Sequence, residues 1–134
     1  MIQPLLIFSD WAIFIGRVVL GLILMRHGLP KLRNLKGTGE WFQSISFRPG
    51  NFWAAVAGIV EFVGGLALVL GFLGQLAAFF VVLEFAVVLL KFKGKAMFQE
   101  DSEKDWLIFS LALLVLTLGS GALSADEILG LVLY

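Results

Sequence analysis

Four apolar runs divide this sequence, and each is close to the length of a membrane-spanning helix. They cover residues of about 11–29, 52–73, 75–90 and 106–123. A helix needs roughly 20 apolar residues to cross the ~30 Å hydrocarbon core of a bilayer. The two middle runs are interpreted as two helices, because one helix of their joint length would overshoot the bilayer about twofold. The pattern therefore predicts an all-α, integral membrane four-helix bundle that forms a single domain over residues 1–134.

The composition agrees with a lipid environment. Hydrophobic residues make up 60% of the chain and charged residues 15%, whereas soluble domains are nearer half and a quarter. So small a chain cannot bury that much apolar surface in one core. We therefore expect the lipid bilayer to be its main partner.

The distribution of basic residues predicts the orientation. Nine of the ten Lys and Arg residues lie in or beside the first and third connections, and only acids lie near the membrane on the other side. The positive-inside rule then places both long connections in the cytoplasm and both termini outside. A cleaved signal peptide is not expected, since an acid, Asp10, and no base precedes the first run, and the stretch from Arg26 to Lys31 stands where a small-residue cleavage site should lie.

Residues that are absent exclude several functions. There is no Cys and only one His, so the chain holds no iron–sulfur cluster through its own thiolates and no c-type haem, and a single subunit offers no bis-histidine haem site. We expect no metal site and no intrinsic redox cofactor. With zero net charge and no basic stripe with interleaved aromatics, a nucleic-acid partner is not expected.

The first connection contains a short segment with helical spacing. Trp41, Phe42 and Ile45 fall on one helical face. We predict a short helix in the headgroup region, capped by Thr38, anchored by Trp41 and Phe42 and ended by Pro49. The third connection, residues 91–105, mixes bases and acids and is predicted to be a solvated loop.

Ionisable residues inside the spans are the candidate site residues. A charge in hydrocarbon costs several kcal/mol and usually faces the bundle interior. These residues are Arg17 and His27 in the first helix, Glu61 in the second and Glu84 in the third, with Lys31 just past the first helix.

Helical geometry brings two of these faces together. Arg17 shares a face of about 80° with Gly21, Gly28 and Lys31, and Glu61 lies between the small residues Gly58 and Gly65. Small residues allow close helix approach in membranes. We therefore predict that the two glycine faces meet and that Arg17 and Glu61 come within hydrogen-bonding reach, with Glu61 at a depth between His27 and Arg17.

Two interpretations of this cluster stay open. In one, Arg17 and Glu61 form a buried ion pair that only fixes helix register. In the other, a polar pocket open to the cytoplasm binds the head of a small amphipathic molecule or relays protons through His27 and Glu61. Glu84 has no cation on its own helix closer than Lys91, so it is either protonated or faces the same pocket.

Several motifs resemble the DoxX family of bacterial and archaeal membrane proteins. They are Gly16-Arg17, Gly21, His27-Gly28-Leu29-Pro30-Lys31-Leu32, Glu61-Phe-Val-Gly64-Gly65 with Leu70-Gly71, and the closing Gly119-Ser-Gly121 and Leu123-Ser124-Ala125-Asp126. The matched polar residues are Arg17, His27, Lys31 and Glu61, and Glu84 has no counterpart in the pattern.

The resemblance implies a four-helix bundle in the plasma membrane of a bacterium or archaeon, related to the DoxD subunit of thiosulfate:quinone oxidoreductases. It implies a non-autonomous subunit of a quinone-linked redox, sulfur-metabolism or oxidative-stress complex, with a quinone as bound molecule and a soluble oxidoreductase or sulfurtransferase as partner. A scaffold that docks soluble partners and a binder of a lipid or small hydrophobic molecule are the alternatives. No residue is assigned a catalytic role, and a monomer or a homo-oligomer fits equally well.

Overall fold

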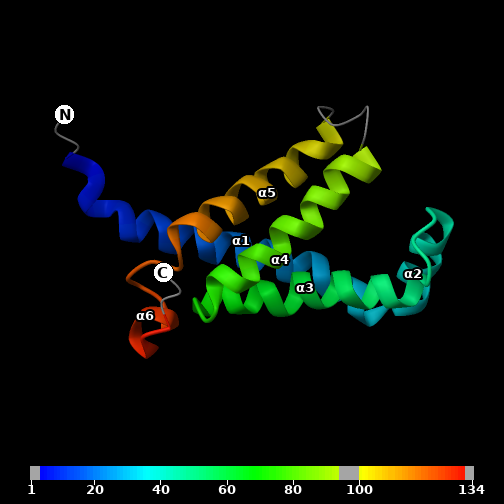
Figure 1. Ribbon diagram of the computed structural model, residues 1–134, viewed down its shortest axis with the longest axis horizontal. Helices are drawn as coiled ribbons and strands as arrows, with labels where there is room; N and C mark the ends of the chain where they lie inside the picture. The colour runs from blue at the N-terminus through cyan, green and yellow to red at the C-terminus, as the bar shows by residue number, and fades with distance from the viewer. Residues whose placement is uncertain (1–3, 94–99, 132–134) are drawn as a thin grey trace.

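The computed structural model describes residues 4–93 and 100–131 and is helical almost throughout (Figure 1). The elements in chain order are η1 (Pro4–Phe8), α1 (Ser9–Arg33), α2 (Leu35–Ser44), α3 (Gly50–Leu70), α4 (Gly74–Val87), the π-helical turn η2 (Val88–Lys93), α5 (Glu100–Leu118) and α6 (Ala125–Leu129).

The four long helices run back and forth between two ends of the molecule. Helix α1 lies beside α3, and α4 lies beside α5. The described first and last residues lie at the same end as α6, whereas α2 lies at the opposite end (Figure 1). Both long connections are therefore at the α2 end, as four alternating helices require.

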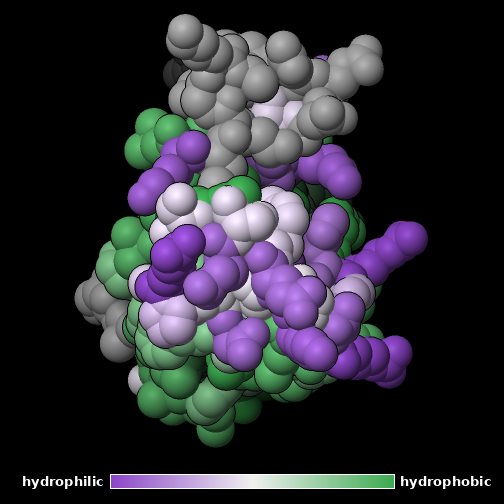
Figure 2. Space-filling model, turned by 90° about the vertical axis from the view of Figure 1, so that its right-hand side faces the viewer, coloured by the Kyte–Doolittle hydropathy of each residue, from purple (hydrophilic) through white to green (hydrophobic). Residues whose placement is uncertain are grey.

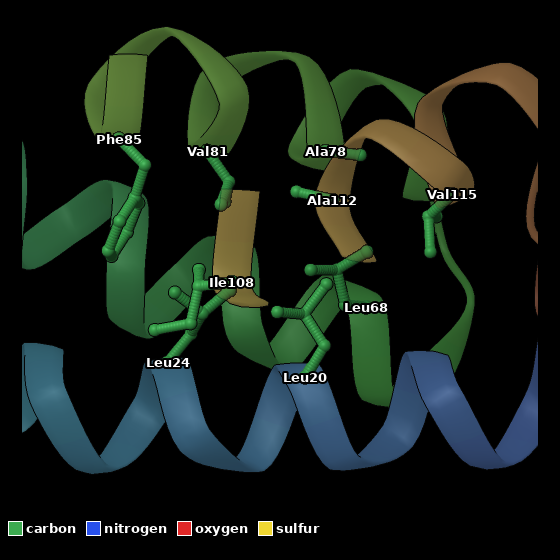
Figure 3. Close-up of a cluster of buried hydrophobic side chains, with 9 residues drawn as sticks. All are labelled: Leu20, Leu24, Leu68, Ala78, Val81, Phe85, Ile108, Ala112 and Val115. Carbon is green, nitrogen blue, oxygen red and sulfur yellow. The ribbon is translucent and has the colours of Figure 1, made fainter. Parts of the chain in front are cut away.

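All four long helices contribute to one apolar core. Leu20 and Leu24 from α1 and Leu68 from α3 face side chains from α4 and α5 (Figure 3). The facing residues are Ala78, Val81 and Phe85 of α4 and Ile108, Ala112 and Val115 of α5. This shared core confirms the predicted all-α bundle.

The contact between α1 and α3 is made by glycines, as predicted. A Cβ built on Gly65 would lie 2.6 Å from the carbonyl oxygen of Gly21, and one built on Gly28 would lie 2.5 Å from the amide nitrogen of Phe62 and 2.9 Å from the carbonyl oxygen of Gly58. The two backbones therefore approach more closely than any side chain at these positions would allow.

The outside of the bundle is apolar, which fits a membrane protein. Large hydrophobic side chains such as Ile15, Ile59 and Leu83 are about half exposed. Three of the described helical segments are long and apolar enough to cross a membrane, namely Pro4–Arg33, Gly50–Leu70 and Gly74–Lys91. Helix α5 is not among them because it begins with the charged stretch Glu100–Asp105, so the fourth span stays a prediction.

Several predicted boundaries shift. Helix α5 ends at Leu118, ahead of the predicted 123, because Gly119 adopts φ +81°. Helix α3 ends at Leu70 rather than 73, with Gly71 at φ +69° and the Phe72 amide donating to the Ala67 carbonyl oxygen over 3.0 Å. Positive φ is the usual way that glycine ends a helix. The prediction of a solvated loop at 91–105 is wrong where the structure describes this segment, because residues 91–93 belong to η2 and residues 100–105 form the start of α5. Residues 94–99 lie outside the described residues.

The short helix in the first connection forms, but it ends at Ser44 rather than at Pro49, and two further details of its prediction are wrong. Its cap is Asn34, whose Oδ1 accepts from the Gly37 amide over 3.0 Å, and not Thr38. Phe42 is not a lipid anchor, since it packs against Ala54 and Ala57 of α3 and is buried. The helix is thereby fixed to the bundle.

Candidate functional site

A cavity of about 850 Å³ lies at the α2 end of the bundle, with walls from α1, α2, α3, α4, η2 and α5. Its ionisable lining residues are His27, Lys31, Glu61, Glu84, Lys91 and Asp105. Its aromatic lining residues are Trp41, Phe42, Phe47, Trp53, Phe80 and Phe85. Apolar walls with a few converging polar groups and a volume of this order are typical of small-molecule sites.

Glu61 forms an ion pair inside this cavity. Lys31 Nζ donates to Glu61 Oε2 over 2.7 Å, and the Glu61 side chain is only 4% exposed while that of Lys31 is 30% exposed. Gly28 permits the approach, because a Cβ there would lie 2.8 Å from the Glu61 Cβ. The close packing of α1 on α3 therefore places the carboxylate within reach of the lysine at the end of α1.

Glu84 enters the same cavity from α4. Its Oε2 atom is buried and has no hydrogen-bond partner among the described residues. Such a group carries a desolvation cost of about 1–3 kcal/mol that no partner offsets. Glu84 therefore faces the pocket, which is one of the two alternatives expected for it.

Three further ionisable groups border the cavity. His27 and Asp105 both interact electrostatically with Glu61. Lys91, on the π-helical turn η2, places its Nζ 4.7 Å from the centroid of the Phe47 ring. This cation–π contact joins the end of α4 to the segment between α2 and α3, and π-helical turns are frequent at functional sites.

The predicted pairing of Arg17 with Glu61 is wrong. Arg17 lies at the other end of α3, where Nη1 donates to the carbonyl oxygens of Leu68 and, over 3.1 Å, Val69, and Nη2 donates to Leu123 over 2.7 Å. The observed register sets Arg17 opposite Val69, about 12 Å along the axis from Glu61. The predicted faces of α1 and α3 are therefore correct, whereas the predicted register between them is wrong.

The closing segment of the chain is held in place beside Arg17. Asp126 Oδ1 accepts from the Leu73 amide over 2.6 Å, and Oδ2 accepts from the Gly74 amide over 2.9 Å and the Ser120 hydroxyl over 2.7 Å. Asp126 thereby satisfies amides at the start of α4. The glycine, serine and aspartate residues of this segment are thus structural.

Figure 2 shows the end of the molecule at which α2 lies in Figure 1. Hydrophilic side chains gather on it and hydrophobic ones border them. The cavity, which α2 helps to line, therefore lies at this polar end of the bundle. Such a position fits a site at a membrane–water boundary.

Of the five residues predicted for the site, the cavity brings together His27, Lys31, Glu61 and Glu84 and leaves Arg17 outside. The sequence analysis missed Asp105 and the aromatic wall. The available signal was the cluster of aromatic residues in the first connection, which was assigned to lipid contact rather than to the cavity.

Comparisons with known proteins agree with this architecture. The DoxX family model matches residues 12–94, which is more than half of the chain. A protein of Bacillus subtilis (strain 168) named "Putative oxidoreductase CatD" is 29% identical over 110 residues, which cover 82% of this chain and 81% of the relative. No solved structure matches the chain. The chain belongs to the DoxX family of membrane proteins.

Proposed function

We propose that this chain is a membrane subunit of a quinone-linked redox complex and that its cavity holds the quinone ring. The observation that carries the proposal is the cavity at the α2 end, where aromatic walls surround a small set of ionisable side chains. The resemblance of the chain to CatD, whose name places it among oxidoreductases, supports a redox role.

The lining suits the two parts of such a molecule. Aromatic walls favour a flat ring, because aromatic pairs gain from stacked or edge-to-face contact. Lys31 and His27 provide nitrogen donors to the carbonyl oxygens that a quinone carries. The ring would lie among Trp41, Trp53 and Phe80, and the electrons would pass through a partner subunit that supplies the redox centre.

Tryptophan fluorescence tests the proposal, because two of the four tryptophans, Trp41 and Trp53, line the cavity. A reporter protein with Trp11→Phe and Trp106→Phe keeps only those two. In phospholipid nanodiscs, decylubiquinone should quench this reporter with a saturable curve that reaches one quinone per chain, since a bound ring lies against the indoles.

A control protein keeps only Trp11, which is 57% exposed and does not line the cavity. Decylubiquinone dissolved in the bilayer should quench it gradually and without saturation. Equal, unsaturated quenching of both proteins would contradict a quinone site. Saturable quenching of the reporter in detergent that disappears in excess phospholipid would instead indicate a lipid site.

A further inference from the structure

Glu84 has a feature that the proposed function leaves unexplained. Glu61, the other carboxyl that α3 and α4 bring into the cavity, is paired with Lys31 over 2.7 Å. Glu84 lines the cavity, and its Oε2 atom is buried without a partner in the described parts of the chain. Buried carboxyl oxygens are usually hydrogen-bonded, so an unpartnered one at a ligand-sized cavity suggests that a ligand completes it.

The charged groups around Glu84 do not supply that partner. Lys31, on α1, is engaged by Glu61, and Lys91, on η2, lies over the Phe47 ring. The other titratable groups that line the cavity are His27 on α1 and Asp105 on α5. None of these is hydrogen-bonded to Glu84 Oε2.

The chemistry of a carboxyl group limits which ligand group fits. An ionised carboxylate offers only acceptor oxygens, so a ligand hydroxyl can donate to it, whereas a protonated carboxyl would also donate to a carbonyl oxygen. A quinone has carbonyl oxygens and no donor, whereas its reduced form, a quinol, has two ring hydroxyls.

We propose that the cavity prefers the reduced, quinol form of its ligand, and that Glu84, as an ionised carboxylate, selects this form by accepting a hydrogen bond from a ring hydroxyl. The inference rests on the proposed function, since it names the ligand form that the same cavity takes. Glu84 is here a specificity-determining residue, and no electron or proton transfer is assigned to it.

Competition against decylubiquinone in the Trp11→Phe, Trp106→Phe reporter tests this selection. The competitors are decylubiquinol, kept reduced under anaerobic conditions, and its dimethyl ether, which has the same ring and tail without a hydroxyl donor. Decylubiquinol should displace the quinone at a concentration at least about tenfold lower than the ether, as expected for a hydrogen bond to a charged group.

Three variants test whether the preference for the quinol depends on Glu84. Glu84→Leu should abolish the preference for the quinol and keep saturable quenching by the quinone, because replacing an unpartnered buried carboxyl by an apolar side chain is tolerated. Glu84→Gln, which keeps an acceptor oxygen, should retain part of the preference. Glu40→Leu removes an exposed glutamate of α2 outside the cavity and should retain all of it.

The outcomes separate the two proposals. Equal competition by the quinol and the ether in the unmutated reporter overturns the inference and leaves the quinone site standing. An undiminished quinol preference in Glu84→Leu overturns the role of Glu84. The absence of saturable quenching by the quinone itself overturns the proposed function and this inference with it.

Discussion

Replacing Gly65 by alanine tests the contact that holds α1 against α3. A Cβ at this position would lie 2.6 Å from the carbonyl oxygen of Gly21, 2.9 Å from the Met25 Cγ and 3.0 Å from the Met25 amide nitrogen. Ordinary contacts begin at about 3.4 Å. Two of these three atoms belong to the α1 backbone, so a side-chain rotation cannot relieve the overlap and the helices must separate by about 0.8 Å locally.

This overlap sets the expected loss in the free energy of unfolding. Forcing one extra carbon into a well-packed interface destabilises by about 1–3 kcal/mol. Because the contact involves backbone on both helices, we expect Gly65→Ala to lie in the upper half of that range. The shift should also weaken the Lys31–Glu61 ion pair, which depends on the same approach of α1 to α3.

Gly64→Ala is a matched control one residue away. Its Cβ would meet only the Val81 Cγ2, at 3.9 Å, which is an ordinary contact. Reversible unfolding of both variants in mixed micelles with increasing SDS, followed by circular dichroism, gives the two free energies of unfolding. Alanine also has the higher helix propensity, so Gly64→Ala should be neutral or slightly stabilising. Equal destabilisation by the two substitutions would refute the glycine interface described above.

Three further predictions concern charged or exposed positions. Lys31→Met should lower the free energy of unfolding by about 1–3 kcal/mol because it leaves the buried Glu61 without its partner, and adding Glu61→Gln should recover part of the loss in the same SDS titration. Asp126→Leu should cost about 2 kcal/mol or more because three donors lose their acceptor, and thermal unfolding should show a smaller loss for Asp126→Asn. Cysteine at the exposed Glu40 should react with impermeant maleimide only from the cytoplasmic side, and cysteine at Ile128, which is 84% exposed, only from outside; reversed labelling would invert the orientation.

The sequence predicted the helices and their facing surfaces well because both depend on local periodicity. Apolar runs defined α1, α3 and α4 to within a few residues, and glycine spacing identified the faces of α1 and α3 that meet. These features repeat along a single helix, so no knowledge of distant contacts is needed to find them.

The register between α1 and α3 and the lining of the cavity could not be predicted from the periodicity of the sequence. A shift of one helical turn along α3 leaves the same residues on the same face, so the spacing of Arg17 and Glu61 could not fix their separation. The place of Phe42 depended on α2 packing against α3 rather than on the bilayer surface. Asp105 lies in a charged stretch whose pattern resembles a solvated loop, and only the fold of α5 brings it to the cavity.

The two ends of the bundle differ in how the buried charged side chains find hydrogen-bond partners. At the α6 end, Arg17 donates to three backbone carbonyl oxygens and Asp126 accepts from three donors, so the protein itself supplies these partners, and only Arg17 Nε lacks one among the described residues at that end. At the α2 end, Glu61 has Lys31, whereas Glu84 Oε2 lacks a partner in the described chain beside a cavity of about 850 Å³. Groups satisfied within the protein stabilise the fold, and a group left for a ligand carries a cost that binding removes. These buried charged residues therefore divide by position, with Arg17 and Asp126 holding the fold at the α6 end, and Glu61 and Glu84 lining, at the α2 end, the cavity in which we propose that a ligand binds.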